Sequence, residues 1–205
     1  MRLEAMAITL PEVVDHPNGI PFEGVLTVVD EASTRPPSGA RGHRVILTRD
    51  AARAALPSLL GMAVDYAPKW DGHDARAKCG IITEADVIGN QLKVRGYLFG
   101  RDFPEVVHQL QQSEASNMGM SYELANAHVA DMRAEVWTLT QATFTGAAIL
   151  LREKAAYRNT SFRLSAGRCR NSSPLRAGSG AGLAARSSWR FEKQSFGQIQ
   201  RRKEA

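Results

Sequence analysis

The sequence predicts an α+β protein with a mostly antiparallel β-sheet or barrel of about seven strands and two or more flanking helices. Three observations carry this prediction. Short apolar, β-branched runs alternate with turn residues along most of the chain. Only two segments repeat apolar residues at the spacing of one helix face. The join Ile88-Gly89-Asn90 between two strand-like runs is typical of a β-hairpin. Strands in such numbers with few helices fit the α+β layer architectures.

The expected strands share apolar, β-branched composition and turn signals at their ends. They are residues 22–29, 43–47, 62–66, 78–87, 91–99, 117–124 and 133–145.

Two helices are expected between these strands. The first spans 48–59, with the Thr48 hydroxyl as its N-cap and Pro57 in its last turn. The second spans 103–113, where Val106 and Leu110 fall on one face.

Charge and composition divide the chain into a body, residues 1–157, and a tail, residues 158–205. The tail holds eleven Lys and Arg against two Glu, whereas the body holds fifteen basic and nineteen acidic residues. The tail is rich in Gly, Ser, Ala and Arg without periodicity, so we expect it to be mostly disordered. Nucleic-acid binding is therefore expected only through the tail, if at all.

Several classes of protein are excluded by simple counts. No apolar run approaches the roughly 18 residues that span a bilayer, and the N-terminus lacks an apolar signal core, so neither a membrane partner nor secretion is expected. The two cysteines, Cys79 and Cys169, are ninety positions apart, which excludes a disulfide framework and a zinc ribbon. No two histidines have the i, i+4 spacing of a helical zinc site, so no metal or cofactor is predicted.

His73 is a candidate general base. It lies in Trp70-Asp71-Gly72-His73-Asp74, a polar turn between two apolar strands. Imidazole titrates near neutrality, and a loop at the rim of a sheet is the usual place for such a base. The alternative is a solvated loop histidine, which spacing alone favours.

Ser121 is a candidate nucleophile within Met118-Gly119-Met120-Ser121-Tyr122. A hydroxyl in an apolar strand is unusual, because burying it unpaired costs about 1–3 kcal/mol; an outward-facing strand serine is the alternative. Gly119 indicates a close approach to the backbone or a bend there. The motif is not the G-x-S-x-G elbow of the α/β-hydrolases.

The order of these pieces resembles the prohead (capsid maturation) serine proteases of tailed phages, which are related in fold to the herpesvirus assemblins. The resemblance spans roughly residues 20–155 and rests on the segments 72–99, 103–110, 118–124 and 135–150. It implies an assemblin-like fold, with His73 as base and Ser121 as nucleophile.

The resemblance also places an acidic third residue of the family at Gln141, in the closing strand. A neutral amide can still orient an imidazole. His128 and Glu135 are the other candidates for this role. A second departure is Glu123, where the family often has glycine.

The predicted function is therefore a serine endopeptidase that cleaves capsid and scaffold proteins, with self-cleavage, during prohead maturation. The resemblance implies the major capsid protein and scaffold as partners, a possible homo-oligomer, and a location in the host or bacterial cytoplasm, inside the phage prohead. Two other hypotheses are open. The chain is an inactive virion assembly protein with the same fold, or it is a nucleic-acid-binding protein that uses its basic tail.

Overall fold

The structure of the chain, a computed structural model, describes residues 6–7, 16–114 and 117–165. The strands are β1 (Met6–Ala7), β2 (Ile20–Val28), β3 (Arg44–Leu47), β4 (Ala63–Tyr66), β5 (Lys78–Ile88), β6 (Gln91–Leu98), β7 (Met118–Val129), β8 (Val136–Leu151) and β9 (Ser161–Leu164). The helices are α1 (Arg49–Ala55) and α2 (Pro104–Gln112), with the short 3₁₀ turns η1 (Leu56–Leu59) and η2 (Arg152–Lys154). The predicted α+β class is confirmed.

The longest strand, β8, organises the sheet. β7 pairs antiparallel with it from Met118↔Leu151 to Val129↔Leu139. β3 and β4 both pair with the opposite edge of β8, because a strand has only two edges. They lie one after the other along that edge, and both run parallel to β8. From β4 the sheet continues antiparallel through β5, β6 and β2 to β9, and β1 pairs with β5. The sheet is thus mixed, with antiparallel pairings in the majority, as the sequence predicts.

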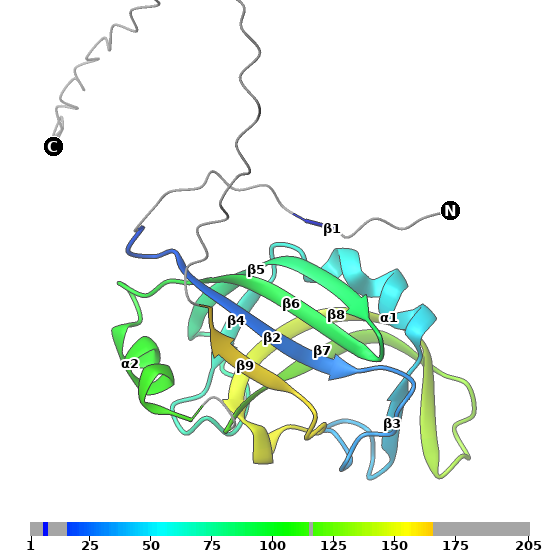
Figure 1. Cartoon of the computed structure of the whole chain (residues 1–205). Helices are drawn as coiled ribbons and strands as arrows, with labels where there is room; N and C mark the ends of the chain where they lie inside the picture. The colour runs from blue at the N-terminus through cyan, green and yellow to red at the C-terminus, as the bar shows by residue number, and fades with distance from the viewer. Residues whose placement is uncertain (1–5, 8–15, 115–116, 166–205) are drawn as a thin grey trace, which may run out of the picture. The chain divides into compact units, whose positions relative to one another are not determined.

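The sheet folds over itself around one apolar core. In Figure 1, β5, β6, β2 and β9 lie in front of β4, β8 and β7, and β7 contacts both β2 and β9. The two layers approach closely at Gly24, where an added Cβ would lie 2.6 Å from the sulfur of Met120. The core is therefore enclosed between the layers, with Met120, Leu26 and Ile82 among its fully buried side chains.

Both expected helices form, and local chemistry explains their limits. The Thr48 hydroxyl accepts a hydrogen bond from the amide of Ala51 at 3.2 Å, the N-cap that the sequence predicts. α1 ends at Ala55, and the predicted final turn becomes η1, which holds Pro57. α2 buries Val106 and Leu110, the predicted face.

The folded body extends beyond the predicted boundary at residue 157. β9 lies in the segment 158–205 yet pairs with β2, and the Phe162 ring, 1% exposed, stacks on Phe22 with ring centroids 4.9 Å apart. The Ser165 amide continues this pairing by donating to the carbonyl of Pro21. The folded body therefore reaches at least Ser165, past the predicted boundary at residue 157, and the predicted disorder of the rest of the tail falls on residues outside those described.

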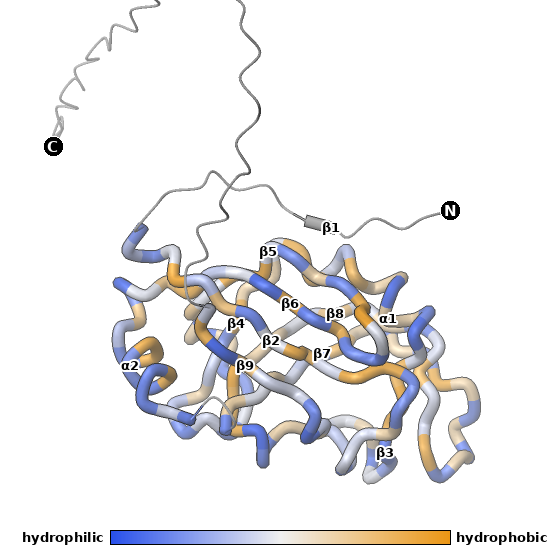
Figure 2. The backbone as a smooth tube through the Cα atoms, in the orientation of Figure 1, coloured by the Kyte–Doolittle hydropathy of each residue, from blue (hydrophilic) through white to orange (hydrophobic). Residues whose placement is uncertain are grey.

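Hydropathy along the backbone follows this arrangement. Figure 2 shows hydrophilic segments on β6 and β9 beside hydrophobic ones, as expected for strands with one face on the core and one in water. Among the described helices, none is long and apolar enough to cross a bilayer.

Candidate functional site

The loop that carries His73, residues 67–77, joins β4 to β5. Trp70 anchors it: its amide donates to the carbonyl of Ala67 at 2.8 Å, and its own carbonyl accepts from the amide of Leu151, in β8, also at 2.8 Å. Trp70 adopts φ +55°, which is uncommon for a residue with a bulky side chain. These backbone bonds hold the loop against the end of β8.

His73 contacts a buried carboxylate. Its Nδ1 lies 3.4 Å from Oδ1 of Asp65, which is close enough for an ion pair but longer than the roughly 2.7–3.2 Å of an N–H···O hydrogen bond, and neither atom has a hydrogen-bond partner among the described residues. Oδ2 of the same carboxylate accepts from Nζ of Lys78 at 2.7 Å. The Asp65 side chain is 1% exposed, that of His73 18% and that of Lys78 38%. Asp65 thus lies between two basic side chains, one on each oxygen.

Asp65 is ionised in this setting. Burial by itself raises the pKa of a carboxyl, but the close contact with His73 and the hydrogen bond and charge of Lys78 outweigh it and hold the pKa of Asp65 below its ordinary value. An anionic carboxylate on Nδ1 keeps a proton on that nitrogen and leaves Nε2 as the free base.

The strand register places Ser121 beside this pair. In β8, Ala148 is the partner of Ser121 on one side and of Asp65 on the other, and Asp65 in turn pairs with Lys78. The row across β7, β8, β4 and β5 is therefore Ser121, Ala148, Asp65 and Lys78. Directly paired residues project from the same face of a sheet, and two strand spacings put the Cα atoms of Ser121 and Asp65 about 10 Å apart.

This row lies on the face opposite the core. The neighbours in sequence, Met120 and Val64, are fully buried in the core cluster, so Ser121 and Asp65 project outward, toward the His73 loop. The predicted pair of His73 and Ser121 therefore lies on one face of the sheet.

A small side chain lies between Asp65 and Ser121 in this row. The residue between them is Ala148, whose side chain is a single methyl group. Nε2 of His73 is buried. Among the described residues, neither this nitrogen nor the Ser121 hydroxyl has a hydrogen-bond partner. Catalytic hydrogen bonds are often long before substrate binds, so this arrangement is compatible with a nucleophile and base that meet on the substrate.

The expected close approach at Gly119 is confirmed. An added Cβ would lie 2.7 Å from Oγ1 of Thr160 and 3.1 Å from Cα of Arg152. Glycine is required here because the segment after β8 crosses β7 beside Ser121.

Gln141 does not lie with His73 and Ser121. It pairs with His128, seven residues along β8 from Ala148, or roughly 20 Å at the rise of a strand. Both Gln141 and His128 are exposed, and Glu135 lies farther still, just before β8 begins. The predicted orienting role of Gln141 is therefore corrected: the side chain beside the imidazole is that of Asp65, and neither His128 nor Glu135 replaces it.

Asp65 is the residue that sequence reasoning missed. The signal was present in the strand-like run Met62-Ala63-Val64-Asp65-Tyr66, since an aspartate is almost never fully buried unless it is paired. What a single sequence does not show is that this strand lies against β8 in register with Ala148.

Cys79 is not an alternative nucleophile. Burial raises the pKa of its thiol to about 12, with the Asp65 charge adding to the effect, and the thiol lies 3.5 Å from the carbonyl of Val64. A thiol in such surroundings stays protonated and inert. Within the described ranges, no three His, Cys, Asp or Glu side chains gather as a metal site would.

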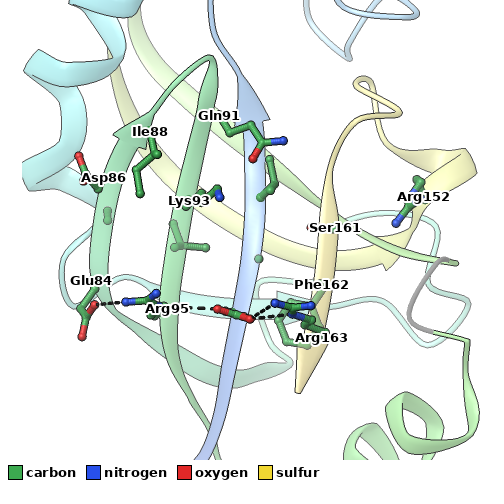
Figure 3. Close-up of a pocket in the computed structure, with 15 residues that line it drawn as sticks. Glu84, Asp86, Ile88, Gln91, Lys93, Arg95, Arg152, Ser161, Phe162 and Arg163 are labelled. Carbon is green, nitrogen blue, oxygen red and sulfur yellow. Dashed lines mark hydrogen bonds and ion pairs between the residues drawn. The ribbon is translucent and has the colours of Figure 1, made fainter. Parts of the chain in front are cut away.

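A groove of about 570 Å³ lies elsewhere, on the outer face of β5, β6, β2 and β9, and neither His73 nor Ser121 lines it. Figure 3 shows a row of charges crossing this face. Arg95 lies 3.2 Å from Glu84 and 3.7 Å from Glu23, and Glu23 also accepts from Nε of Arg163 at 2.7 Å. These charges neutralise one another, and the groove holds no candidate nucleophile beside a base.

Comparisons with known proteins do not assign a function to this site. No protein-family model and no curated protein sequence matches the chain. Among solved structures the chain is similar to the KSHV protease in complex with a hexapeptide phosphonate inhibitor, at 14% identity and a TM-score of 0.43. The match covers 69% of this chain and 63% of that one, so the chain spans less than two thirds of that protease. At this level the likeness assigns neither a family nor an activity.

Proposed function

We propose that the chain is a serine endopeptidase with Ser121 as nucleophile, His73 as general base and Asp65 as the residue that orients the imidazole. The observation that carries this proposal is the row in which Ser121 and Asp65 flank Ala148, with His73 in contact with Asp65. A nucleophile, a base and an orienting acid on one face form the constellation that acyl transfer needs.

The steps follow from these positions. The Ser121 hydroxyl oxygen attacks the carbonyl carbon of a peptide bond while Nε2 of His73 accepts its proton. The tetrahedral intermediate collapses, and the imidazolium returns the proton to the leaving amine. Water then attacks the acyl-serine ester while His73 accepts its proton; the ester bond breaks, the second product leaves as a carboxylic acid, and the imidazolium returns the proton to the Ser121 oxygen. Throughout, the Asp65 carboxylate accepts from the Nδ1 proton and stabilises the imidazolium by a charge-assisted hydrogen bond.

The proposed substrates are capsid and scaffold proteins, cleaved inside a phage prohead together with the protease's own chain. This part of the proposal rests on the sequence resemblance described above. The groups that carry the chemistry make no demand for a metal or cofactor, because both proton transfers run through His73.

Cleavage by the purified chain tests the proposal. The wild-type protein is incubated alone and with a peptide library, and new termini are identified by mass spectrometry. We expect fragments that disappear in Ser121→Ala and in His73→Ala but persist in Ser113→Ala, a matched serine at the end of α2, outside the site. Fragments that persist in Ser121→Ala would contradict the proposal. Complete absence of cleavage by the folded wild type would favour an inactive assembly protein on this fold.

A further inference from the structure

Lys78 occupies an unusual position relative to the candidate site. It is the first residue of β5, and it pairs with Asp65 immediately after the loop that carries His73. Asp65 and Lys78 therefore lie at the two ends of the loop, residues 67–77. Nζ of Lys78 donates to Oδ2 of Asp65 at 2.7 Å.

The Asp65 carboxylate needs a counter-charge that a neutral His73 does not supply. A buried carboxylate without a full counter-charge either takes up a proton or draws one onto its neighbour. A neutral imidazole supplies a hydrogen bond but no charge, and a general base must be neutral before it acts. Lys78 supplies a full positive charge on the oxygen that does not face His73.

Arg76 and Glu105, two other charged groups nearby, are engaged elsewhere. Within the loop, Arg76 bonds Asp74, with Nε 3.1 Å from Oδ1, and on α2 Glu105 accepts from the Tyr66 hydroxyl at 2.7 Å. The titratable groups of the loop and of the elements beside it are thus Asp65, Tyr66, Lys78, Cys79, Glu105, Asp74, Arg76 and the exposed Lys69 and Asp71. Of the cations in this set, Lys78 is the one that bonds Asp65.

We propose that Lys78 is a positioning residue of the candidate site: its ammonium group holds Oδ2 of Asp65, which directs Oδ1 at the imidazole and offsets the negative charge that the ring would otherwise face. The inference rests on the proposed peptidase function for its catalytic consequence, but its electrostatic consequence can be measured without activity. Lys78 lets Asp65 orient His73 without forcing a proton onto Nε2.

The direction of the effect follows from the charges. Replacing Lys78 by Met leaves the carboxylate uncompensated, so the positive imidazolium is favoured. His73 should then lose its extra proton only at higher pH. We expect the acid limb of the kcat/KM profile to move to higher pH by on the order of one unit. Above that limb, kcat should stay within a few fold of wild type.

The test compares Lys78→Met with Lys78→Arg, which keeps the charge, and with Arg76→Met. Arg76 is the matched control because it is a cation in the loop just before Lys78. Its side chain is 90% exposed and pairs with Asp74 rather than with Asp65. NMR titration of the His73 ring in a Ser121→Ala background is the second readout, and it requires no turnover. We expect the titration midpoint to rise in Lys78→Met alone.

An unmoved or lowered midpoint in Lys78→Met, or an equal rise in Arg76→Met, would overturn the inference, whether or not the protein cleaves peptides. A moved midpoint in a protein without peptidase activity would support the electrostatic role and reject the proposed function. If Lys78→Met does not fold, the double variant Lys78→Met/Asp65→Asn should, because it also removes the stranded charge. A double variant that stays unfolded would equally overturn the inference.

Discussion

A carboxylate in contact with one nitrogen of an imidazole decides which tautomer the ring adopts. Asp65, 3.4 Å from Nδ1 of His73, selects the form with its proton on Nδ1. In Asp65→Asn the amide can instead donate to Nδ1, which moves the proton to Nε2 and removes the base. We expect kcat/KM to fall by on the order of 10³–10⁴-fold, measured on a peptide that the wild type cleaves.

The matched control for that variant is Gln141→Leu, which changes the exposed residue opposite His128. Its kcat/KM should stay within about two-fold of wild type, as is usual for a surface substitution far from a site. A large loss in Gln141→Leu with little change in Asp65→Asn would return the orienting role to Gln141.

Ala148 is fully buried and contributes only a methyl group between Asp65 and Ser121, so a larger side chain there should displace the imidazole. In Ala148→Leu we expect cleavage to fall by at least about 10²-fold, since a displacement of 1 Å has that effect on a reacting pair. Ala148→Gly, which only removes a methyl group, should retain most of the cleavage activity. The comparison uses kcat/KM together with the unfolding midpoint, so that misfolding is recognised; equal activity in both variants would contradict this role.

At the scale of the elements, β6 carries a glycine that its neighbours require. Gly96 pairs with Ile82 and Phe22, and an added Cβ would lie 1.9 Å from the carbonyl oxygen of Ile81. That oxygen belongs to the sheet backbone and is not free to move aside. We expect Gly96→Ala to lower the free energy of unfolding by at least about 3 kcal/mol in a urea titration.

Gly72→Ala is the control for the Gly96 substitution. An added Cβ at Gly72 meets no atom within 4 Å, so its free energy of unfolding should change by less than about 0.5 kcal/mol. Similar losses in the two variants would show that the contact at Ile81 is not what limits residue 96.

Elements that owe their formation to local pattern were predictable from the sequence. The expected strands 78–87 and 91–99 correspond to β5 and β6 within a residue, because alternation and the turn between them are local signals. β9 was missed because its four residues lie in a stretch rich in polar residues, and its pairing is with β2, about 140 residues earlier. Only tertiary contact distinguishes such a segment from a disordered one.

The same distinction explains the site. His73 and Ser121 lie in local motifs, and both could be selected from the sequence as candidates. The identity of the third residue depends on how β4 and β7 align on opposite edges of β8. Register between strands distant in sequence is set by packing of the whole sheet, so the acid at residue 65 became apparent only in three dimensions.

In the molecule as a whole, the net positive charge lies in the residues that follow the described body. Residues 166–205 hold nine Lys and Arg against two Glu, whereas the preceding residues hold seventeen basic and nineteen acidic ones, so all of the net positive charge lies after β9. The described body contributes paired charges instead, such as the row of Glu84, Arg95, Glu23 and Arg163 on its outer face (Figure 3). Binding of an acidic partner through the tail therefore stays a prediction separate from the chemistry at Ser121.

Two truncations test where the folded body ends. Residues 166–205 are rich in Gly, Ser, Ala and Arg and offer few apolar anchors, so ending the chain after Ser165 should leave the thermal unfolding midpoint and its cooperativity unchanged. Ending it after Tyr157 also removes β9, and with it the stacking of Phe162 on Phe22 and the pairing with β2. Loss of a buried Phe alone costs about 3–5 kcal/mol, so this shorter chain should unfold at a much lower temperature or fail to fold. Calorimetry of both truncations against the full chain decides the matter. Equal midpoints for the two would show that β9 adds nothing to the body, whereas a loss already present after Ser165 would show that residues 166–205 contribute to its stability.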